Sequence, residues 1–381
     1  MVKGARAMGS VNQTVFARGK RVALVAGAVV LSMVASACAK KSTNFSLLPD
    51  ANQFKQNGAV IHGKIDVLWV IDNSGSMKAS QQALADNFSR FIEKFNAKKY
   101  DYRLAVTTTD AYRVLFKGAP TFAQFRDGTD LTSHTGVRIV TPDTANLVPT
   151  FMTNVLQGTN GVGDERAFQS FREALKSPLN AEHGFPRPDA FLAVIIVSDE
   201  DDFSHDTSQF RDGQYDYAGL HTVQSYVDYL DGVMGANDGN RSTKYNVNTI
   251  GVLDADCKAI LESGENAKTG LKKIGKRYIE LSEKTNGVVG DICGDFGSTL
   301  SNISNTIIQR TSQFYLDRQP DPSTVAVTID GVNVPRLPED APEPRNGFIY
   351  HPDTNSVTFH GDFEPAVGAT INVNFDPLTL K

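Results

Sequence analysis

Two apolar runs that each lead to an aspartate constrain the fold of this chain more than any other feature. The first, Val67–Ile71, is mostly β-branched or aromatic and leads to Asp72, and the second, Phe191–Val197, leads to Asp199. Such runs are typical of strands that are buried on both faces, as in a parallel sheet. Beyond Met77 apolar residues recur at helical spacing, which predicts one buried helix face (Leu84, Phe88, Phe91, Ile92 and Phe95).

The loop after the first run carries three oxygen-bearing side chains at alternate positions, Asp72, Ser74 and Ser76. It lies at the carboxyl end of a strand, where open α/β sheets bind their ligands. A carboxylate and two hydroxyls are hard donors that suit a small octahedral cation, so the pattern predicts a Mg²⁺ or Mn²⁺ site. Because two donors are neutral, the cation would keep much of its charge and a free coordination position. The other interpretation is a metal-free connection, since Asp and Ser also cap helices and form turns.

The apolar strand followed by Asp-x-Ser-x-Ser-Met resembles the metal-ion-dependent adhesion site (MIDAS) of von Willebrand factor A (vWA) domains. The resemblance implies an α/β fold with a doubly wound, mostly parallel, Rossmann-like sheet flanked by helices. It also implies that Ser74 and Ser76 ligate the cation and that Asp199 completes the site, directly or through water. The family's remaining ligand is usually a Thr just before a helix, where helix register here places Asp164 or Glu165. A carboxylate at that position would weaken the attraction of the cation for an acidic partner.

In that family the cation is coordinated by a carboxylate of the partner molecule. The resemblance therefore implies a non-enzymatic binding or adhesion protein, with a protein or peptide partner that offers an acidic side chain. An architectural envelope protein with a purely structural metal site is the alternative. A metal-dependent, phosphatase-like enzyme of the haloacid-dehalogenase type fits less well, because Ser74 stands where that mechanism needs a second Asp as general acid. No Gly-x-Ser-x-Gly elbow or phosphate-binding Gly-Lys-Ser/Thr loop occurs, so no enzyme is predicted.

Residues 1–37 have the features of a secretory signal peptide. They contain five basic residues and no acidic one, and Val22–Ala37 is an apolar stretch too short for a comfortable membrane span. The small residues before Cys38 resemble the lipobox of bacterial lipoproteins, which implies that Cys38 is lipidated; ordinary cleavage with an unmodified Cys38 is the alternative. Residues 38–62 are predicted to form a polar tether. We therefore expect an exported protein of the bacterial envelope, periplasmic or at the cell surface, held to the membrane by its lipid anchor only.

Charge and cysteine content narrow the partners further. Removal of the signal lowers the formal net charge from −5 to −10. This acidic excess repels phosphate, so no nucleic-acid partner is predicted. Cys257 and Cys293 remain as an even pair in an exported protein, which predicts one disulfide. No Cys/His spacing suits zinc.

An acidic segment, Glu200–Asp206, follows Asp199 directly. The first interpretation is a solvated acidic loop. The alternative is that Asp201 or Asp202 holds a second cation such as Ca²⁺, or that His205 reaches a partner.

The C-terminal part of the chain changes in pattern near residue 314. Before it, within a vWA-like domain predicted over residues 63–313, Leu271, Ile274, Tyr278 and Leu281 recur at helical spacing and predict a late helix. After it, apolar residues alternate with polar ones between turn signals. Residues 314–381 are therefore predicted to form a small all-β module.

Overall fold

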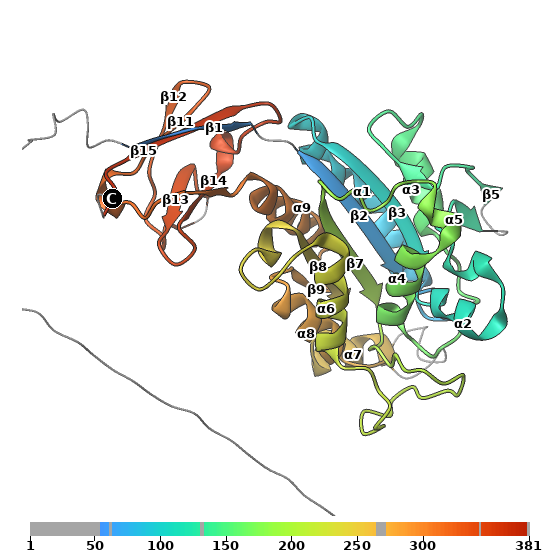
Figure 1. Cartoon of the computed structure of the whole chain (residues 1–381). Coiled ribbons are helices and arrows are strands. Elements are labelled where there is room, and N and C mark those ends of the chain that lie inside the picture. The colour runs from blue at the N-terminus through green and yellow to red at the C-terminus, as the bar shows by residue number, and fades with distance from the viewer. Residues whose placement is uncertain (1–53, 61–62, 130–132, 264–271, 343, 379–381) are drawn as a thin grey trace, which may run out of the picture. The chain divides into compact units, whose positions relative to one another are not determined.

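The computed structural model describes residues 54–60, 63–129, 133–263, 272–342 and 344–378 (Figure 1). The predicted signal peptide, Cys38 and most of the predicted tether lie outside the described residues. Residues Phe54–Val60, which we predicted as the end of the tether, form strand β1 and pair antiparallel with β15 (Thr370–Phe375). No helix in the described parts of the chain is both long and apolar enough to cross a bilayer.

A six-stranded sheet forms the centre of the larger domain, in the order β6-β3-β2-β7-β8-β9. Neighbouring strands are parallel except β3 and β6, which are antiparallel. The strands are β2 (Lys64–Ile71), β3 (Asp101–Thr108), β6 (Ile139–Val140), β7 (Phe191–Ser198), β8 (Tyr245–Gly251) and β9 (Val289–Asp291). The register pairs Ile71 with Val197, so the residues that follow β2 and β7 leave the sheet at the same edge. The predicted doubly wound, mostly parallel sheet is confirmed.

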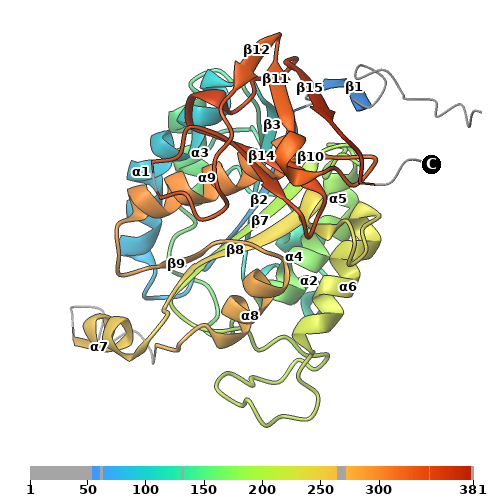
Figure 2. The ribbon, with the colours of Figure 1, turned by 90° about the vertical axis from the view of Figure 1, so that its left-hand side faces the viewer.

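Helices cover both faces of this sheet (Figures 1 and 2). Alternate residues of β2 point to opposite faces, so Trp69 packs in one apolar cluster and Leu68 in another. The helices of the Trp69 cluster are α1 (Lys78–Ala97), α3 (Leu147–Val155) and α9 (Phe296–Ser312). Those of the Leu68 cluster are α4 (Ala167–Lys176), α6 (Val223–Met234) and α8 (Lys276–Lys284). The helix face predicted after Met77 is the buried face of α1.

The start of α8 differs from the sequence prediction. The helix begins at Lys276, so Ile274 precedes it, and Leu271 lies outside the described residues. Residues 272–275 instead form a connection without helical structure. This difference matters because that connection borders the candidate site.

Short elements complete the larger domain. They are α2 (Val114–Lys117), α5 (Pro178–Ala181), α7 (Ala255–Ser263), the β4–β5 pair (Gly128–Thr129 and Ser133–His134), and the 3-10 turns η2 (Ala111–Arg113), η3 (Pro120–Ala123) and η4 (Arg241–Thr243). The predicted disulfide is confirmed, with Cys257 of α7 joined to Cys293 after β9 at a Cα–Cα distance of 5.7 Å. Asp291 lies near both sulfurs, but bonded cysteines supply no thiolate for a metal. Closing a loop of this size stabilises the fold by roughly 3–4 kcal/mol.

The C-terminal segment forms the predicted small β module. One sheet has the order β1-β15-β11-β12 and the other β10-β14-β13. Residues of both sheets share one apolar core that includes Val327, Ile371, Phe348 and Phe359. The module's strands are β10 (Phe314–Tyr315), β11 (Ala326–Ile329), β12 (Val332–Val334), β13 (Gly347–His351), β14 (Ser356–His360) and β15, with 3-10 turns η6 (Pro322–Thr324) and η7 (Gly361–Phe363).

Candidate metal centre

The loop between β2 and α1 is fixed around the carboxylate of Asp72. The Asp72 N–H donates to the Val197 carbonyl of β7 at 3.0 Å, which ties the loop to the neighbouring strand. The Asp72 carboxylate accepts from the Ser74 N–H at 2.8 Å and from the Ser198 hydroxyl at 2.7 Å. Gln81 of α1 donates to the Asp72 carbonyl at 2.8 Å, so the helix also holds the loop. Asp72 is therefore a positioned acceptor at the carboxyl edge of the sheet.

The two serines connect Asp72 with Asp199. The hydroxyl oxygens of Ser74 and Ser76 lie 3.4 Å apart, and the Ser76 hydroxyl donates to Asp199 Oδ1 at 3.0 Å. All four side chains are at most 4% exposed. The structure thus brings the four predicted ligands together, and their hard oxygens form the donor set that a small divalent cation prefers.

Of the two carboxylates predicted near this site, the structure points Asp164 away from it. Asp164 Oδ2 accepts from Arg166 Nε at 3.0 Å and from Nη2 at 2.6 Å, and its Oδ1 accepts from the Arg211 N–H at 3.3 Å. The Arg166 guanidinium in turn lies over the Tyr112 ring, 4.4 Å from its centroid. Asp164 is therefore part of a buried ion pair and is not free to bind a metal.

Glu165, the other carboxylate, has no such partner. Its side chain is fully buried, and neither oxygen makes a hydrogen bond of good geometry with a described residue, although the nearby Thr109 hydroxyl partly stabilises the charged form. Burial raises the pKa of Glu165 well above its usual value, and the charges of Asp72 and Glu200 raise it further. A buried carboxylate with two unsatisfied oxygens is costly unless a cation compensates it. Glu165 therefore fits the remaining position of the ligand set better than Asp164 does.

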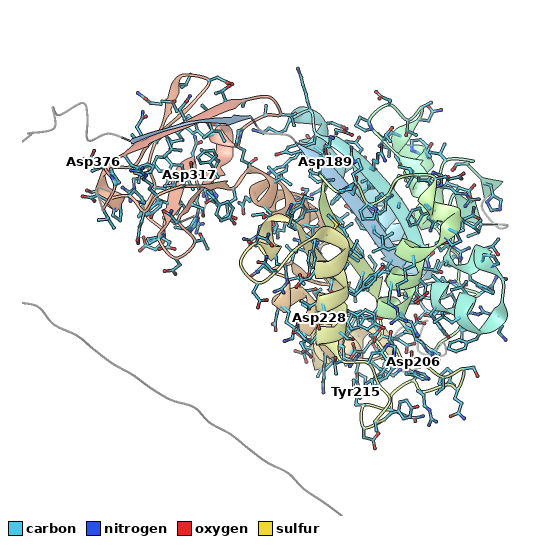
Figure 3. The ribbon with its side chains drawn as sticks, in the orientation of Figure 1. Asp189, Asp206, Tyr215, Asp228, Asp317 and Asp376 are labelled. Atoms are coloured by element: carbon cyan, nitrogen blue, oxygen red, sulfur yellow. A yellow bond between two sulfur atoms is a disulfide. The ribbon has the colours of Figure 1, made fainter. Side chains whose placement is uncertain are left out.

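Residues 200–205 of the acidic segment are buried, so the predicted solvated loop is wrong for this part, although Asp206 is exposed. Asp201 accepts hydrogen bonds from the Arg277 N–H and from the Tyr215 hydroxyl. Tyr215 lies in the long loop between β7 and α6 (Figure 3). Asp202 accepts from the Phe168 N–H at 3.0 Å and pairs with Arg277 at 3.3 Å. Hydrogen-bond donors of the protein thus contact both oxygens of Asp201 and of Asp202. These two carboxylates therefore leave no oxygen free for the second cation, Ca²⁺, that was the alternative.

The alternative in which His205 reaches a partner does not fit the structure either. The ring is fully buried, its Nδ1 lies 2.8 Å from the Phe203 carbonyl, and its Nε2 lies 3.0 Å from the Gln209 carbonyl. Arg166 Nη2 lies 3.1 Å from the same Nε2. The histidine therefore stabilises the loop from inside and does not face a partner.

Sequence reasoning missed one member of the site, Lys272. Its side chain is 1% exposed, and its Nζ lies 2.7 Å from Asp199 Oδ2. The sequence shows Lys272 next to a second lysine, Lys273, but the helical spacing predicted both to lie within the late helix. In the structure both precede that helix. Lys272 brings a fixed positive charge to the group of carboxylates.

The charges of this cluster favour a bound divalent cation. Burial raises the pKa of Asp72 to about 7, and the nearby charge of Asp199 adds to the effect. Burial likewise raises the pKa of Glu200 to about 7. When they are ionised, Asp72, Glu165 and Asp199 carry three negative charges and Lys272 one positive charge. Even with Lys272 in place the cluster keeps an excess of negative charge, which attracts a divalent cation, so the residues present fit Mg²⁺ or Mn²⁺.

Comparison with known proteins gives distant similarities of fold. No family model and no curated protein matches the chain. Proximal thread matrix protein 1 from the mussel byssus is 11% identical over 70% of this chain and 52% of its own, with a TM-score of 0.36. Another structure of that protein, 10% identical with a TM-score of 0.36, has a zinc-occupied MIDAS motif.

Two further structures are also only distantly similar. The pilus adhesin SpaC from Lactobacillus rhamnosus GG is 12% identical over 85% of this chain and 40% of its own, with a TM-score of 0.37. The ArnB paralog VWA2 from Sulfolobus acidocaldarius is 11% identical over 86% of this chain and 63% of its own, with a TM-score of 0.29. The chain spans about half the length of the mussel protein and less of the adhesin. TM-scores of this size support no inference about function, which rests on the geometry of the site.

Proposed function

We propose that this protein is a non-enzymatic, lipid-anchored binding or adhesion protein of the bacterial envelope. It holds Mg²⁺ or Mn²⁺ at Asp72, Ser74, Ser76 and Asp199, and it engages a protein or peptide partner whose acidic side chain completes the coordination of the cation. The single observation that carries the proposal is the convergence of these four buried oxygen donors at the carboxyl edge of β2 and β7.

The hydrogen bonds within the cluster favour binding over catalysis. The hydroxyl of Ser76 donates to Asp199 and that of Ser198 donates to Asp72. A serine nucleophile needs a base that accepts its proton and is itself oriented by a third group. In the described part of the cluster the bases are carboxylates that already share the hydroxyls, and no imidazole is hydrogen-bonded to them. This arrangement suits a cation cage.

Glu165 favours a second candidate, an architectural protein with a structural cation. If this third carboxylate binds the ion, protein oxygens satisfy its charge and leave little attraction for an outside acid. The near-complete burial of the four predicted ligands is consistent with that alternative. The two candidates differ in one respect only, namely whether a partner depends on the cation.

A pull-down from envelope extract distinguishes them. The mature chain is used as bait in Mg²⁺, in EDTA, and in Mg²⁺ with Ser76→Ala, whose hydroxyl lies in the cluster. Ser225→Ala is the matched control, because Ser225 is exposed on α6 and its hydroxyl donates to the Thr222 carbonyl. We expect a partner that is retained only by the parent and by Ser225→Ala in Mg²⁺. Identical partners in all conditions, with circular dichroism showing intact folds, would leave the structural cation as the better account.

A further inference from the structure

Lys272 places an ammonium group on one of the proposed metal ligands. Its Nζ lies 2.7 Å from Asp199 Oδ2, while Asp199 Oδ1 accepts the Ser76 hydroxyl at 3.0 Å. An ammonium has three donors, yet Nζ makes no hydrogen bond of good geometry with any described residue. The group is therefore held by charge, in a buried position, beside the side chains that would surround a metal.

The backbone carries Lys272 to this position. The Lys273 N–H donates to the Asp199 carbonyl at 3.3 Å, and the Gly275 N–H donates to the Val252 carbonyl at 2.9 Å. The Lys273 side chain pairs with Glu200 Oε2 at 2.7 Å and with Asp212 Oδ2 at 2.6 Å. Two consecutive lysines thus pair with two consecutive acids, in the same order along both segments. Lys272 is therefore part of a built contact and not a surface side chain that happens to fold inward.

A buried ammonium is tolerated only where an opposite charge compensates its loss of hydration. Lys272 meets that condition through Asp199, the carboxylate that the proposed function assigns to the metal. A divalent cation on the same carboxylate would be repelled by the ammonium at close range. The two cations therefore exclude each other at Asp199 unless Lys272 moves.

We propose that Lys272 is a tethered cation that competes with the divalent ion for Asp199. In the metal-free protein its ammonium fills part of the site, and the metal binds as the ammonium withdraws. This inference rests on the proposed metal site and adds a residue that sets the affinity of that site. The segment that follows Lys272 is bonded to Glu200, Asp201 and Asp202. Withdrawal of the Lys272 side chain would therefore also loosen these contacts, so metal binding would change the conformation of the long β7–α6 loop.

The first test compares the Mn²⁺ affinities of three variants with that of the parent, by titration calorimetry on the mature chain. Lys272→Met removes the charge and keeps the length of the side chain, and Lys272→Arg keeps the charge. Lys273→Met is the matched control, since Lys273 pairs with Glu200 and Asp212 instead of Asp199. We expect Lys272→Met to bind Mn²⁺ about tenfold more tightly or better. Lys272→Arg should bind no more tightly than the parent, and Lys273→Met should stay within about twofold of it.

The second test uses the parent chain, because Lys272→Met leaves Asp199 without its buried partner and could prevent folding. Acetic anhydride is added in pulses, and mass spectrometry measures acetylation of Lys272 relative to the exposed Lys78. We expect slow acetylation of Lys272 in EDTA and clearly faster acetylation in saturating Mn²⁺. A merely structural ion pair would stay protected in both conditions.

Equal or weaker Mn²⁺ binding by Lys272→Met, or unchanged acetylation of the parent at saturating Mn²⁺, would overturn the competition and leave the metal site in place. Binding by Lys272→Met with none by the parent would support the competition and overturn the proposed metal-dependent function of the native protein. Failure of the parent and of every folded variant to bind would overturn both.

Discussion

The substitution Glu165→Gln should have opposite effects on the metal-free fold and on metal binding. Glu165 is fully buried, and the Thr109 hydroxyl compensates its oxygens only in part, since neither makes a hydrogen bond of good geometry with a described residue. Leaving a buried polar group unsatisfied costs about 1–3 kcal/mol, and more when the group is charged. Gln has the same shape and no charge, so at pH 8 the metal-free variant avoids the cost of burying a charge or taking up a proton and should be more stable by about 1–3 kcal/mol. For a domain of the size of the larger one, at about 2–4 °C per kcal/mol, this raises the melting temperature by roughly 2–12 °C.

The same substitution removes one negative charge from the ligand set, so the affinity for Mn²⁺ should fall. We expect a loss of about tenfold or more, which corresponds to about 1.4 kcal/mol. The assay is differential scanning calorimetry in EDTA together with calorimetric Mn²⁺ titration. Asp164→Asn is the matched control, because Asp164 is adjacent in sequence but pairs with Arg166. It should destabilise the fold and leave Mn²⁺ affinity within about threefold of the parent.

The pH dependence provides a further check of the same reasoning. The folded-state pKa of Asp72 is raised to about 7 by burial and that of Glu165 is raised well above 4.5, so folding favours the protonated forms of both. A group of this kind contributes stability that is complete below its unfolded pKa, near 4, and is lost as the pH rises through the folded value. In EDTA the parent should therefore lose stability as the pH rises from about 4 to 8, and Glu165→Gln should lose less. An unchanged melting temperature in EDTA together with unchanged Mn²⁺ affinity would refute the role of Glu165.

Three other substitutions test the loop and the fold. In Gly161→Ala the new Cβ would lie 2.6 Å from Asn73 O, so Mn²⁺ binding should weaken several-fold in titrations while the melting temperature changes little. Gly287→Ala would place its Cβ 1.8 Å from a β8 carbonyl oxygen, and urea unfolding should show a loss of about 3 kcal/mol or more, whereas a loss under about 1 kcal/mol would contradict the packing. Arg187→Met leaves the buried Asp66 unpaired at the other end of β2, so urea unfolding should show a loss of about 3–5 kcal/mol that adding Asp66→Asn partly restores.

Local patterns were sufficient to predict the central sheet. The runs before Asp72 and Asp199 are apolar at every position because both faces of β2 and β7 are covered. An unbroken apolar run can be recognised in the sequence alone. The face of α1 followed from the spacing of its phenylalanines for the same reason. Strand β1 has no comparable pattern in the sequence. Its pairing partner, β15, lies more than 300 residues away along the chain, and a short polar segment does not indicate such a contact.

The candidate site was predictable where its donors share one loop and not where they come from distant segments. Asp72, Ser74 and Ser76 are neighbours in sequence, so their spacing alone indicated a cation. The choice between Asp164 and Glu165 depends on which way each side chain leaves the loop, which Arg166 decides by pairing with Asp164. The contact of Lys272 with Asp199 spans 73 residues, and no local pattern marks this lysine as buried. Burial of the acidic run depends in the same way on distant basic residues.

The most direct measurement is the anomalous scattering of a crystal grown with Mn²⁺. We predict one peak between Asp72, Ser74, Ser76 and Asp199, at about 2.0–2.2 Å from the two serine hydroxyl oxygens, with the Lys272 ammonium displaced from Asp199. A map from saturating Mn²⁺ with no peak in this cluster, and with Lys272 still paired to Asp199, would contradict the metal centre.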